Sequence, residues 1–178
     1  MSKLFPSDTE RLRFRRQDMD DAAFIHSLLS DPEHMRFYPR TYSLEEARGW
    51  IDWQLSLYRD HGFGLWALEL KETDELVGQC GLTIQDVEGV DEVEIGYHIS
   101  KAYWRQGLAA EAACACRDFA FDALGLERIV ITTGADNLPS QGVARKVGMS
   151  FAKDYIKVRE GKELAQVLFT LDRARHLG

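Results

Sequence analysis

The sequence contains little cysteine and no arrangement of residues typical of a metal site. There are 3 Cys among 178 residues, at Cys80, Cys114 and Cys116. An odd number without a secretory leader argues against a disulfide framework. Cys114 and Cys116 are two residues apart on an expected helix, so they do not share a face. The 5 His are scattered, and we therefore expect reduced, structural cysteines and no metal.

Long apolar runs are also missing. No stretch approaches the roughly 18 apolar residues that indicate a transmembrane helix. The sequence does not begin with a basic segment followed by an apolar one, as a signal peptide would. We therefore expect no membrane contact and a cytoplasmic location.

Positive charge is in the minority. Lys and Arg number 22 against 29 Asp and Glu, which gives a formal net charge of −7. General nucleic-acid binding needs a basic footprint, so no nucleic-acid partner is expected. A polyanionic ligand would have to be held by local features, whereas basic acceptors are mildly favoured by long-range attraction. Solubility is a sufficient alternative reason for the acidic balance.

The length and the hydrophobic pattern predict one domain, residues 1–178, of mixed α/β class. The expected order is strand, two helices, three strands, helix, strand, helix and two strands, with helices on both faces of the sheet. The expected strands are 10–15, 64–70, 76–82, 92–99, 128–133, 151–158 and 164–171. The expected helices are 18–29, one that begins after the capping residue Ser43, 108–124, and one between Asn137 and Gly148.

A glycine-containing turn joins the strand 92–99 to the helix that follows it. The segment 103–112 reads Tyr-Trp-Arg-Gln-Gly-Leu-Ala-Ala-Glu-Ala. The first backbone N–H groups of a helix have no intrahelical partner and attract anions, and Gly107 lets the backbone approach a bulky anion. The segment is neither a P-loop nor a dinucleotide turn. By itself it predicts either a phosphate site or an ordinary strand-to-helix corner.

A second segment, 137–149, follows the strand 128–133 and reads Asn-Leu-Pro-Ser-Gln-Gly-Val-Ala-Arg-Lys-Val-Gly-Met. The two segments, with Glu-Ile-Gly-Tyr at 94–97, resemble the GCN5-related N-acetyltransferase (GNAT) superfamily. Within it they are most similar to the branch of ribosomal-protein-alanine acetyltransferases, over about residues 10–171. The resemblance implies a central, mostly antiparallel sheet of about seven strands and acetyl-coenzyme A (acetyl-CoA) as cosubstrate.

The resemblance also implies where the coenzyme A (CoA) diphosphate would bind. The backbone N–H groups of Arg105, Gln106, Gly107, Leu108, Ala109 and Ala110 would cradle it. Trp104 stands where the wider family has Gln or Arg, so Arg105 is the alternative source of positive charge. Further cofactor contacts are expected at His98, Ile99, Asn137, Arg145 and Lys146. For Arg145 and Lys146 the helix dipole is an equally good reason for a cation at that position.

The acetyl transfer itself needs a base and a donor for the departing thiolate. The resemblance implies a strand glutamate as base, which is Glu94, or Glu92 if a bulge shifts the register; both could also be exposed alternating residues. The tyrosine acid of many relatives is missing, because its position is Ala144. Ser140 is then the catalytic candidate and Asn137 a positioning group, although both also suit a helix cap. No Cys or Ser is paired with His in a pattern for covalent catalysis.

We therefore expect direct acetyl transfer to a primary amine, either a protein N-terminus or a small molecule. The alternative from another class is a regulatory module that binds acyl-CoA without turnover. Homodimers are common in the family. The aromatic side chains expected either in the acceptor groove or in the core are Phe37, Tyr38, Trp50, Trp53 and Tyr155.

Overall fold

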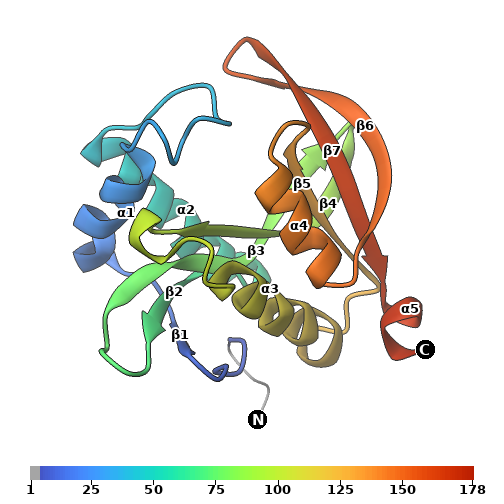
Figure 1. Ribbon diagram of the computed structural model, residues 1–178, viewed down its shortest axis with the longest axis horizontal. Coiled ribbons are helices and arrows are strands. Elements are labelled where there is room, and N and C mark those ends of the chain that lie inside the picture. Colours follow the sequence, from blue (N-terminus) through green and yellow to red (C-terminus); the bar gives the residue numbers. More distant parts are fainter. Residues whose placement is uncertain (1–4) are drawn as a thin grey trace.

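The computed structural model describes residues 5–178, and these residues form a sheet of seven strands in the order β1-β2-β3-β4-β5-β7-β6 (Figure 1). The neighbouring strands are antiparallel except for β4 and β5. The strands are β1 (Leu12–Arg15), β2 (Leu65–Leu70), β3 (Leu76–Val87), β4 (Val90–Ile99), β5 (Arg128–Gly134), β6 (Ser150–Arg159) and β7 (Lys162–Asp172). The expected mostly antiparallel, seven-stranded sheet is confirmed.

Two of the five α-helices described begin at a side-chain cap that the sequence predicts. The five are α1 (Ala22–Leu29), α2 (Leu44–His61), α3 (Leu108–Asp118), α4 (Leu138–Lys146) and α5 (Arg173–Leu177). Ser43 and Glu46 form the expected capping box at the start of α2. Asn137 caps α4 by accepting a hydrogen bond from the Ser140 N–H at 3.2 Å.

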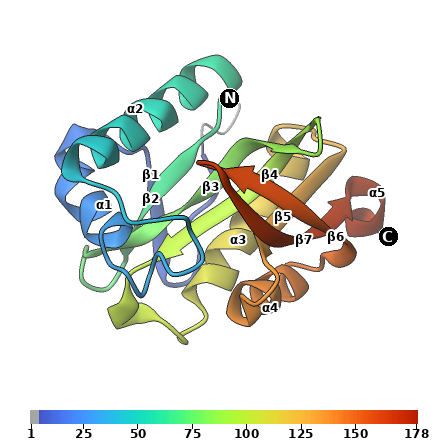
Figure 2. The same cartoon turned by 90° about the horizontal axis from the view of Figure 1, so that it is seen from above.

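The helices cover both faces of the sheet. Neighbouring residues of β3 show this, because their side chains point to opposite faces. Gln79 faces α2, where its side-chain oxygen accepts a hydrogen bond from the Trp50 indole at 3.2 Å. Cys80 points the other way, and its sulfur lies 3.6 Å from that of Cys116 in α3. Figure 2 shows α1 and α2 on one side of the sheet and α3 and α4 on the other.

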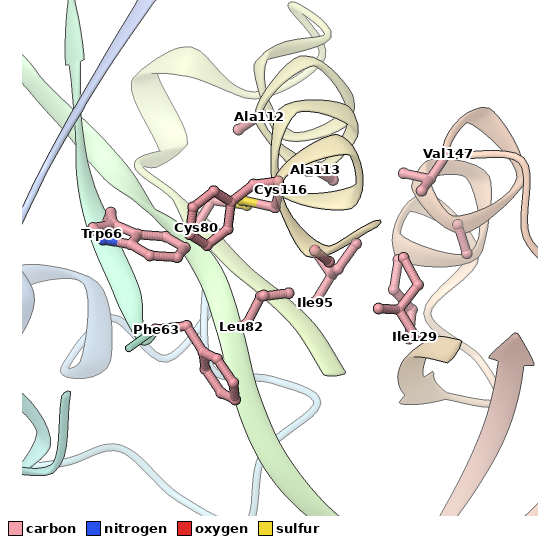
Figure 3. Close-up of a cluster of buried hydrophobic side chains, with 14 of the residues drawn as sticks. Phe63, Trp66, Cys80, Leu82, Ile95, Ala112, Ala113, Cys116, Ile129 and Val147 are labelled. Atoms are coloured by element: carbon pink, nitrogen blue, oxygen red, sulfur yellow. The ribbon is translucent and has the colours of Figure 1, made fainter. Parts of the chain in front are cut away.

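The main core lies between the sheet and α3. Small side chains on α3, such as Ala112, Ala113 and Cys116, are fully buried and let the helix approach the sheet closely (Figure 3). Trp66 from β2 is fully buried in the same cluster, with Phe119 at 5.3 Å between ring centroids. A second cluster joins α1 to α2.

The parallel contact between β4 and β5 is short. Its register consists of one pair, Glu94 with Val130. Further along, the Thr132 N–H donates to the side-chain carboxylate of Glu94 and not to the β4 backbone, at 3.3 Å. The C-terminal half of β4 is thus free of a parallel partner in β5 over the part of the chain that the structure describes.

The predicted order of strands and helices is confirmed, and four details differ from it. The helix expected at 18–29 begins as a 3-10 turn, Met19–Asp21, capped by Asp18. The hairpin of β3 and β4 extends to Val87 and Val90, beyond the expected strands. The helix expected to run to 124 changes to a π-helical turn at Phe119–Ala123, and α5 was not expected. None of the helices found in residues 5–178 has the length and apolar character to cross a membrane.

Candidate active site

A cavity of about 1120 Å³ runs beside the unpaired half of β4. Its walls come from the segment after α1, from α2, β4 and β5, from the N-terminal ends of α3 and α4, and from β6 and β7. The predicted site residues that line it are Glu94, His98, Ile99, Arg105, Gly107, Leu108, Ala109, Ala110, Asn137, Ser140 and Lys146. The volume exceeds that of a typical single-ligand pocket, so it leaves room for two reactants.

One end of the cavity is formed by the turn that precedes α3. Gly107 is the N-cap of α3 with a φ of 80°, in the left-handed region that favours glycine. The N–H groups of the next residues, Leu108 to Ala110, have no carbonyl four residues earlier within the helix. The first bond of the helix runs from the Glu111 N–H to the Gly107 carbonyl at 3.0 Å. This end of the cavity therefore offers free donors and a positive helix dipole to an anion.

The same turn is held from outside by Arg11. The Arg11 guanidinium donates to the Gln106 carbonyl at 2.8 Å and to the Glu111 carboxylate at 2.7 Å. Glu111 also accepts from the Arg11 N–H at 2.9 Å and from the Thr9 hydroxyl at 2.5 Å. Burial alone would raise the pKa of Glu111, but these hydrogen bonds outweigh it and the pKa is lowered. Gln106 thus contributes its carbonyl to the support of the turn and does not line the cavity.

Trp104 and Arg145 also have structural contacts that the sequence did not reveal. The Trp104 indole N–H donates to the Ile99 carbonyl at 2.6 Å and so ties the turn to the end of β4. The Arg145 guanidinium lies 5.4 Å from the ring centre of Phe169 and does not line the cavity, whereas its neighbour Lys146 does. The helix-dipole interpretation suits Arg145.

Glu94 lies near the point where β4 and β5 part. Its carboxylate accepts hydrogen bonds from the Thr132 N–H and hydroxyl. Burial raises the pKa of Glu94, although the Thr132 bonds and the charges of Lys157 and Arg159 oppose that rise. Glu92, the alternative base, pairs with Arg128 at 3.1 Å and does not line the cavity.

Gly96 leaves open space beside the Glu94 carboxylate. A Cβ atom added to Gly96 would lie 3.9 Å from Glu94 Oε1 and 3.4 Å from Leu65 Cδ2. An alanine would therefore occupy space next to the carboxylate, in ordinary contact distance of it. The glycine leaves that space available for a small polar group.

Ser140 is hydrogen-bonded to Tyr97 of β4, the last residue of the Glu-Ile-Gly-Tyr motif, for which the sequence predicted no site role. The Tyr97 and Ser140 hydroxyl oxygens lie 2.6 Å apart, and the Tyr97 hydroxyl is 3.1 Å from the Ser140 carbonyl oxygen. Burial raises the pKa of Tyr97, so its phenol stays protonated at neutral pH. Ala144, where many relatives have a tyrosine, is fully buried in the core. The only hint in the sequence was that a buried tyrosine needs a partner for its hydroxyl group.

His98 belongs to a chain of hydrogen bonds that the sequence did not predict. His98 Nδ1 lies 2.9 Å from Nε2 of His34, and its Nε2 lies 3.3 Å from the Tyr38 hydroxyl. Burial lowers the pKa of His98 to about 3 and lowers that of His34 as well. Both imidazoles are therefore neutral at neutral pH.

The aromatic candidates divide between the cavity and the core. Phe37, Tyr38, Trp50 and Trp53 line the cavity. Tyr155 is instead buried in a separate cluster with Val87, Val130 and Leu168. The α2 face that carries Trp50 and Trp53 is therefore a wall of the cavity as well as a packing surface.

Comparison with known proteins gives the family. Residues 11–150 match the acetyltransferase (GNAT) domain family. The chain belongs to the GNAT acetyltransferase family. Its expected N-acetyltransferase class is thereby confirmed, and GNAT enzymes use acetyl-CoA. The residues matched include Arg11, Glu94 and Ser140 and end before Lys157 and Arg159 of β6.

Three similar proteins illustrate the match. The uncharacterized N-acetyltransferase p20 of Bacillus licheniformis is 30% identical over 176 residues, which cover 96% of this chain and 97% of p20. The structure of a GNAT-family acetyltransferase from Bacillus anthracis has a TM-score of 0.79 at 24% identity, covering 96% of this chain and 99% of that one. A RimL ribosomal L7/L12 α-N-protein acetyltransferase, solved in complex with CoA, has a TM-score of 0.75 at 18% identity, covering 93% and 96%. The two structures show that this chain has the GNAT fold.

Proposed function

We propose that this GNAT protein transfers an acetyl group directly from acetyl-CoA to a primary amine bound in the cavity. The observation that carries the proposal is that one cavity contains both the N-terminal end of α3 and a half-buried carboxylate, Glu94. Binding the two reactants side by side makes the reaction effectively unimolecular. The acceptor remains a primary amine of a small molecule or of a peptide N-terminus.

The residues present fit CoA. The free N–H groups at Leu108 to Ala110 and the positive φ of Gly107 suit a diphosphate, and Arg105 and Lys146 line the same part of the protein surface as cations. The uncovered half of β4, which ends at Ile99, offers backbone groups for an extended chain such as the pantetheine arm. That a CoA complex exists for the RimL protein of the same fold supports this assignment.

Glu94 is the proposed base. Acetyl-CoA supplies a thioester carbonyl that only an uncharged amine can attack. Glu94 takes the proton from the ammonium group of the acceptor, directly or through one water molecule above Gly96. Its raised pKa makes the ionised carboxylate a better proton acceptor than that of an exposed glutamate.

Ser140 is the proposed hydrogen-bond donor to the departing thiolate, and Tyr97 assists it. In this role the Tyr97 hydroxyl donates to Ser140 Oγ, and the Ser140 hydroxyl donates its own proton toward the sulfur. Asn137 positions Ser140 through the helix cap. Two neutral hydroxyl groups in series would thus do the work of the single tyrosine acid that the resemblance implies for many family members at the position of Ala144.

A covalent acetyl-cysteine route is not supported. No cysteine of residues 5–178 lines the cavity. Burial raises the pKa of Cys114 and that of Cys116, which keeps both thiols protonated and poorly nucleophilic.

The test is release of free CoA thiol from acetyl-CoA in the presence of a panel of primary amines and peptides. At least one amine should support turnover, and mass spectrometry of the enzyme with acetyl-CoA alone should show no acetyl-cysteine. Binding of acetyl-CoA without turnover on any amine would refute the proposed transfer. A trapped acetyl-Cys114 would refute the direct route.

A further inference from the structure

We propose that the acceptor is a small primary amine that carries a carboxylate close to its nitrogen, as an amino acid does, and that Lys157 and Arg159 bind that carboxylate. The inference deepens the proposed function and rests on it. It concerns the part of the cavity that β6 lines.

Lys157 and Arg159 are half-buried cations with neutral partners. Both lie on β6 and line the cavity. The Lys157 ammonium donates to the Gln85 side-chain oxygen at 2.9 Å, and the Arg159 guanidinium donates to the Tyr42 hydroxyl at 3.2 Å. Neither forms an ion pair with a carboxylate anywhere in residues 5–178. Half-buried cations whose hydrogen-bond partners are neutral are costly unless nearby negative charge, such as that of a ligand, offsets them.

Lys157 lies far from the proposed phosphate site. Its partner Gln85 pairs in register with Glu92 of β4. The turn before α3 follows Ile99 at the other end of that strand, roughly 24 Å away for seven residues, so CoA phosphates bound at that turn do not account for Lys157. Arg159 lies nearer to the middle of the cavity, because its guanidinium is 5.5 Å from the ring centre of Tyr38, whose hydroxyl lies 3.3 Å from His98 Nε2.

The charges at this end match an ammonium and a carboxylate in the same molecule. The carboxylates that line the cavity are Glu33 and Glu94, and Glu33 is already paired with Lys101 at 2.7 Å. Glu94 is therefore the carboxylate available to the reacting ammonium. Both Lys157 and Arg159 lie close enough to Glu94 for their charges to act on it. A molecule with one amine and one carboxylate would satisfy all three groups.

The roof over this end favours a small acceptor. Side-chain hydrogen bonds tie the tip of the β6–β7 hairpin to the segment between α1 and α2, toward which the hairpin extends (Figure 1). Glu160 accepts from Arg40 at 2.9 Å, and Lys162 donates to the Pro39 carbonyl at 2.8 Å. These bonds hold the hairpin next to Phe37 and Tyr38 of the cavity wall, which leaves less room there for an extended peptide.

The proposal changes one expectation from composition. A net charge of −7 favours basic acceptors at long range. Inside the cavity, the second ammonium of a polyamine would meet Lys157 and Arg159 and be repelled. We therefore expect polyamines and aminoglycosides to be poor acceptors.

The experiment measures kcat/KM for CoA-thiol release with amino acids, each paired with its carboxamide and its decarboxylated amine. A peptide beginning with Asp and a polyamine complete the panel. The wild type should prefer the best amino acid over its carboxamide at least tenfold. A matching preference for the acidic peptide over its Asn counterpart would identify a peptide N-terminus as the source of the carboxylate.

The variants make the test specific. Lys157→Met and Arg159→Met should each lower kcat/KM for the amino acid about tenfold or more and change kcat/KM for the carboxamide little. Arg159→Lys should recover part of the loss. Lys153→Met is the matched control, because Lys153 is on the same strand but exposed and paired with Glu88. The thermal shift with acetyl-CoA should be retained in every variant, which shows that the variants fold.

Three outcomes are decisive. An equal loss of kcat/KM on the amino acid and its carboxamide in these variants, or polyamines as the best substrates, would overturn the carboxylate site. Either result would leave the proposed acetyl transfer intact. Selective loss in Lys157→Met and Arg159→Met would support the carboxylate site. Absence of thiol release with every amine would instead refute the proposed function on which this inference rests.

Discussion

At the scale of single residues, two carboxylates two positions apart in one strand have different environments. Glu92 pairs with Arg128 outside the cavity, whereas Glu94 lies in the cavity with Thr132. The strand period of two puts both on the same face. What separates them is where β5 leaves β4, immediately after Glu94.

Replacing Glu94 with Gln should therefore remove the base. We expect kcat/KM for the amine to fall by about 10²-fold or more, while Glu92→Gln stays within about threefold of wild type. The pH profile of the wild type should rise with increasing pH through a pKa above 4.5, because the raised pKa is that of the group that must be ionised. Steady-state rates over a range of pH check both points. An unchanged rate in Glu94→Gln would remove Glu94 from the mechanism.

His98 should make the fold sensitive to acid. Its pKa is about 3 in the folded protein against 6.5 for an ordinary histidine. The unfolded chain therefore binds a proton that the folded chain does not, and stability falls as the pH drops below about 6.5. At pH 5 this amounts to about 2 kcal/mol.

Denaturant titrations at pH 7 and pH 5 test this expectation. The wild type should lose about 2 kcal/mol more than His98→Gln between the two pH values. His61→Gln, at an exposed position, should behave like the wild type. The same loss in the wild type and His98→Gln would contradict the assignment.

At the scale of elements, the N-terminus of α3 depends on β1 for its position. The first turn carries two left-handed residues, Arg105 with a φ of 61° and Gly107 with a φ of 80°. Such a turn persists when surrounding contacts hold it. Arg11, directly before β1, supplies them through Gln106 and Glu111.

Arg11→Met should loosen this turn without touching the acceptor. We expect KM for acetyl-CoA to rise about fivefold, which corresponds to about 1 kcal/mol, with kcat within about twofold. Arg13→Met is the matched control, because it removes a nearby arginine that pairs instead with Asp74 at 2.7 Å. It should leave KM unchanged, and an equal rise in both variants would rule out a specific role for Arg11. Initial rates at varied acetyl-CoA measure the difference.

The close approach of β2 and β3 depends on Gly81. A Cβ atom at this position would lie 1.9 Å from the Gly64 carbonyl oxygen and 2.7 Å from Leu65 Cα. Backbone atoms cannot move aside without separating the strands. Gly81→Ala should therefore cost about 3 kcal/mol or more.

Gly49→Ala is the matched control for Gly81→Ala. Gly49 is exposed within α2, and an added Cβ atom there has no neighbour within 4 Å in the described chain. The substitution should stabilise the protein by about 0.5–1 kcal/mol. Chemical denaturation measures both variants, and a small effect of Gly81→Ala would show that β2 and β3 can separate at little cost.

At the scale of the whole molecule, the cavity joins two parts of the sheet. Its walls come from β4 with α2 and the segment after α1 on one side and from β5, α4 and the β6–β7 hairpin on the other. Within the sheet, the register between β4 and β5 consists of the single Glu94–Val130 pair. The hydrophobic core beneath the sheet also joins the two parts. A ligand in the cavity should therefore stabilise the molecule as a whole.

Acetyl-CoA should raise the midpoint of thermal unfolding. At about a hundred times Kd the gain is about 2.7 kcal/mol, or roughly 5–10 °C for a chain of this size. NAD and ATP serve as controls and should give no saturable shift. Absence of a shift with acetyl-CoA would contradict the interpretation of Gly107 and Asn137 as cofactor contacts.

Much of the fold was predictable from local patterns. Alternating and helical periodicity reflect which face of an element is buried, and they predicted the order of the elements. The caps at Ser43 and Asn137 were predicted from residue types that suit helix N-termini. The π-helical turn after Asp118 was not predictable, because it preserves the apolar stripe that indicated a continuing α-helix. The short helix α5 has too few residues to show a period.

The sequence alone determined the family, the position of the proposed phosphate turn and the pair of candidate carboxylates, because these lie in contiguous motifs. Tertiary structure alone decided which contacts form between distant segments: Tyr97 with Ser140, His34 with His98, Arg11 with Glu111, and the unpaired cations of β6 near Glu94. The physical reason is that burial, hydrogen bonding and pKa depend on neighbours in space, and such neighbours, up to 100 residues apart for Arg11 and Glu111, leave no periodic signal in the chain.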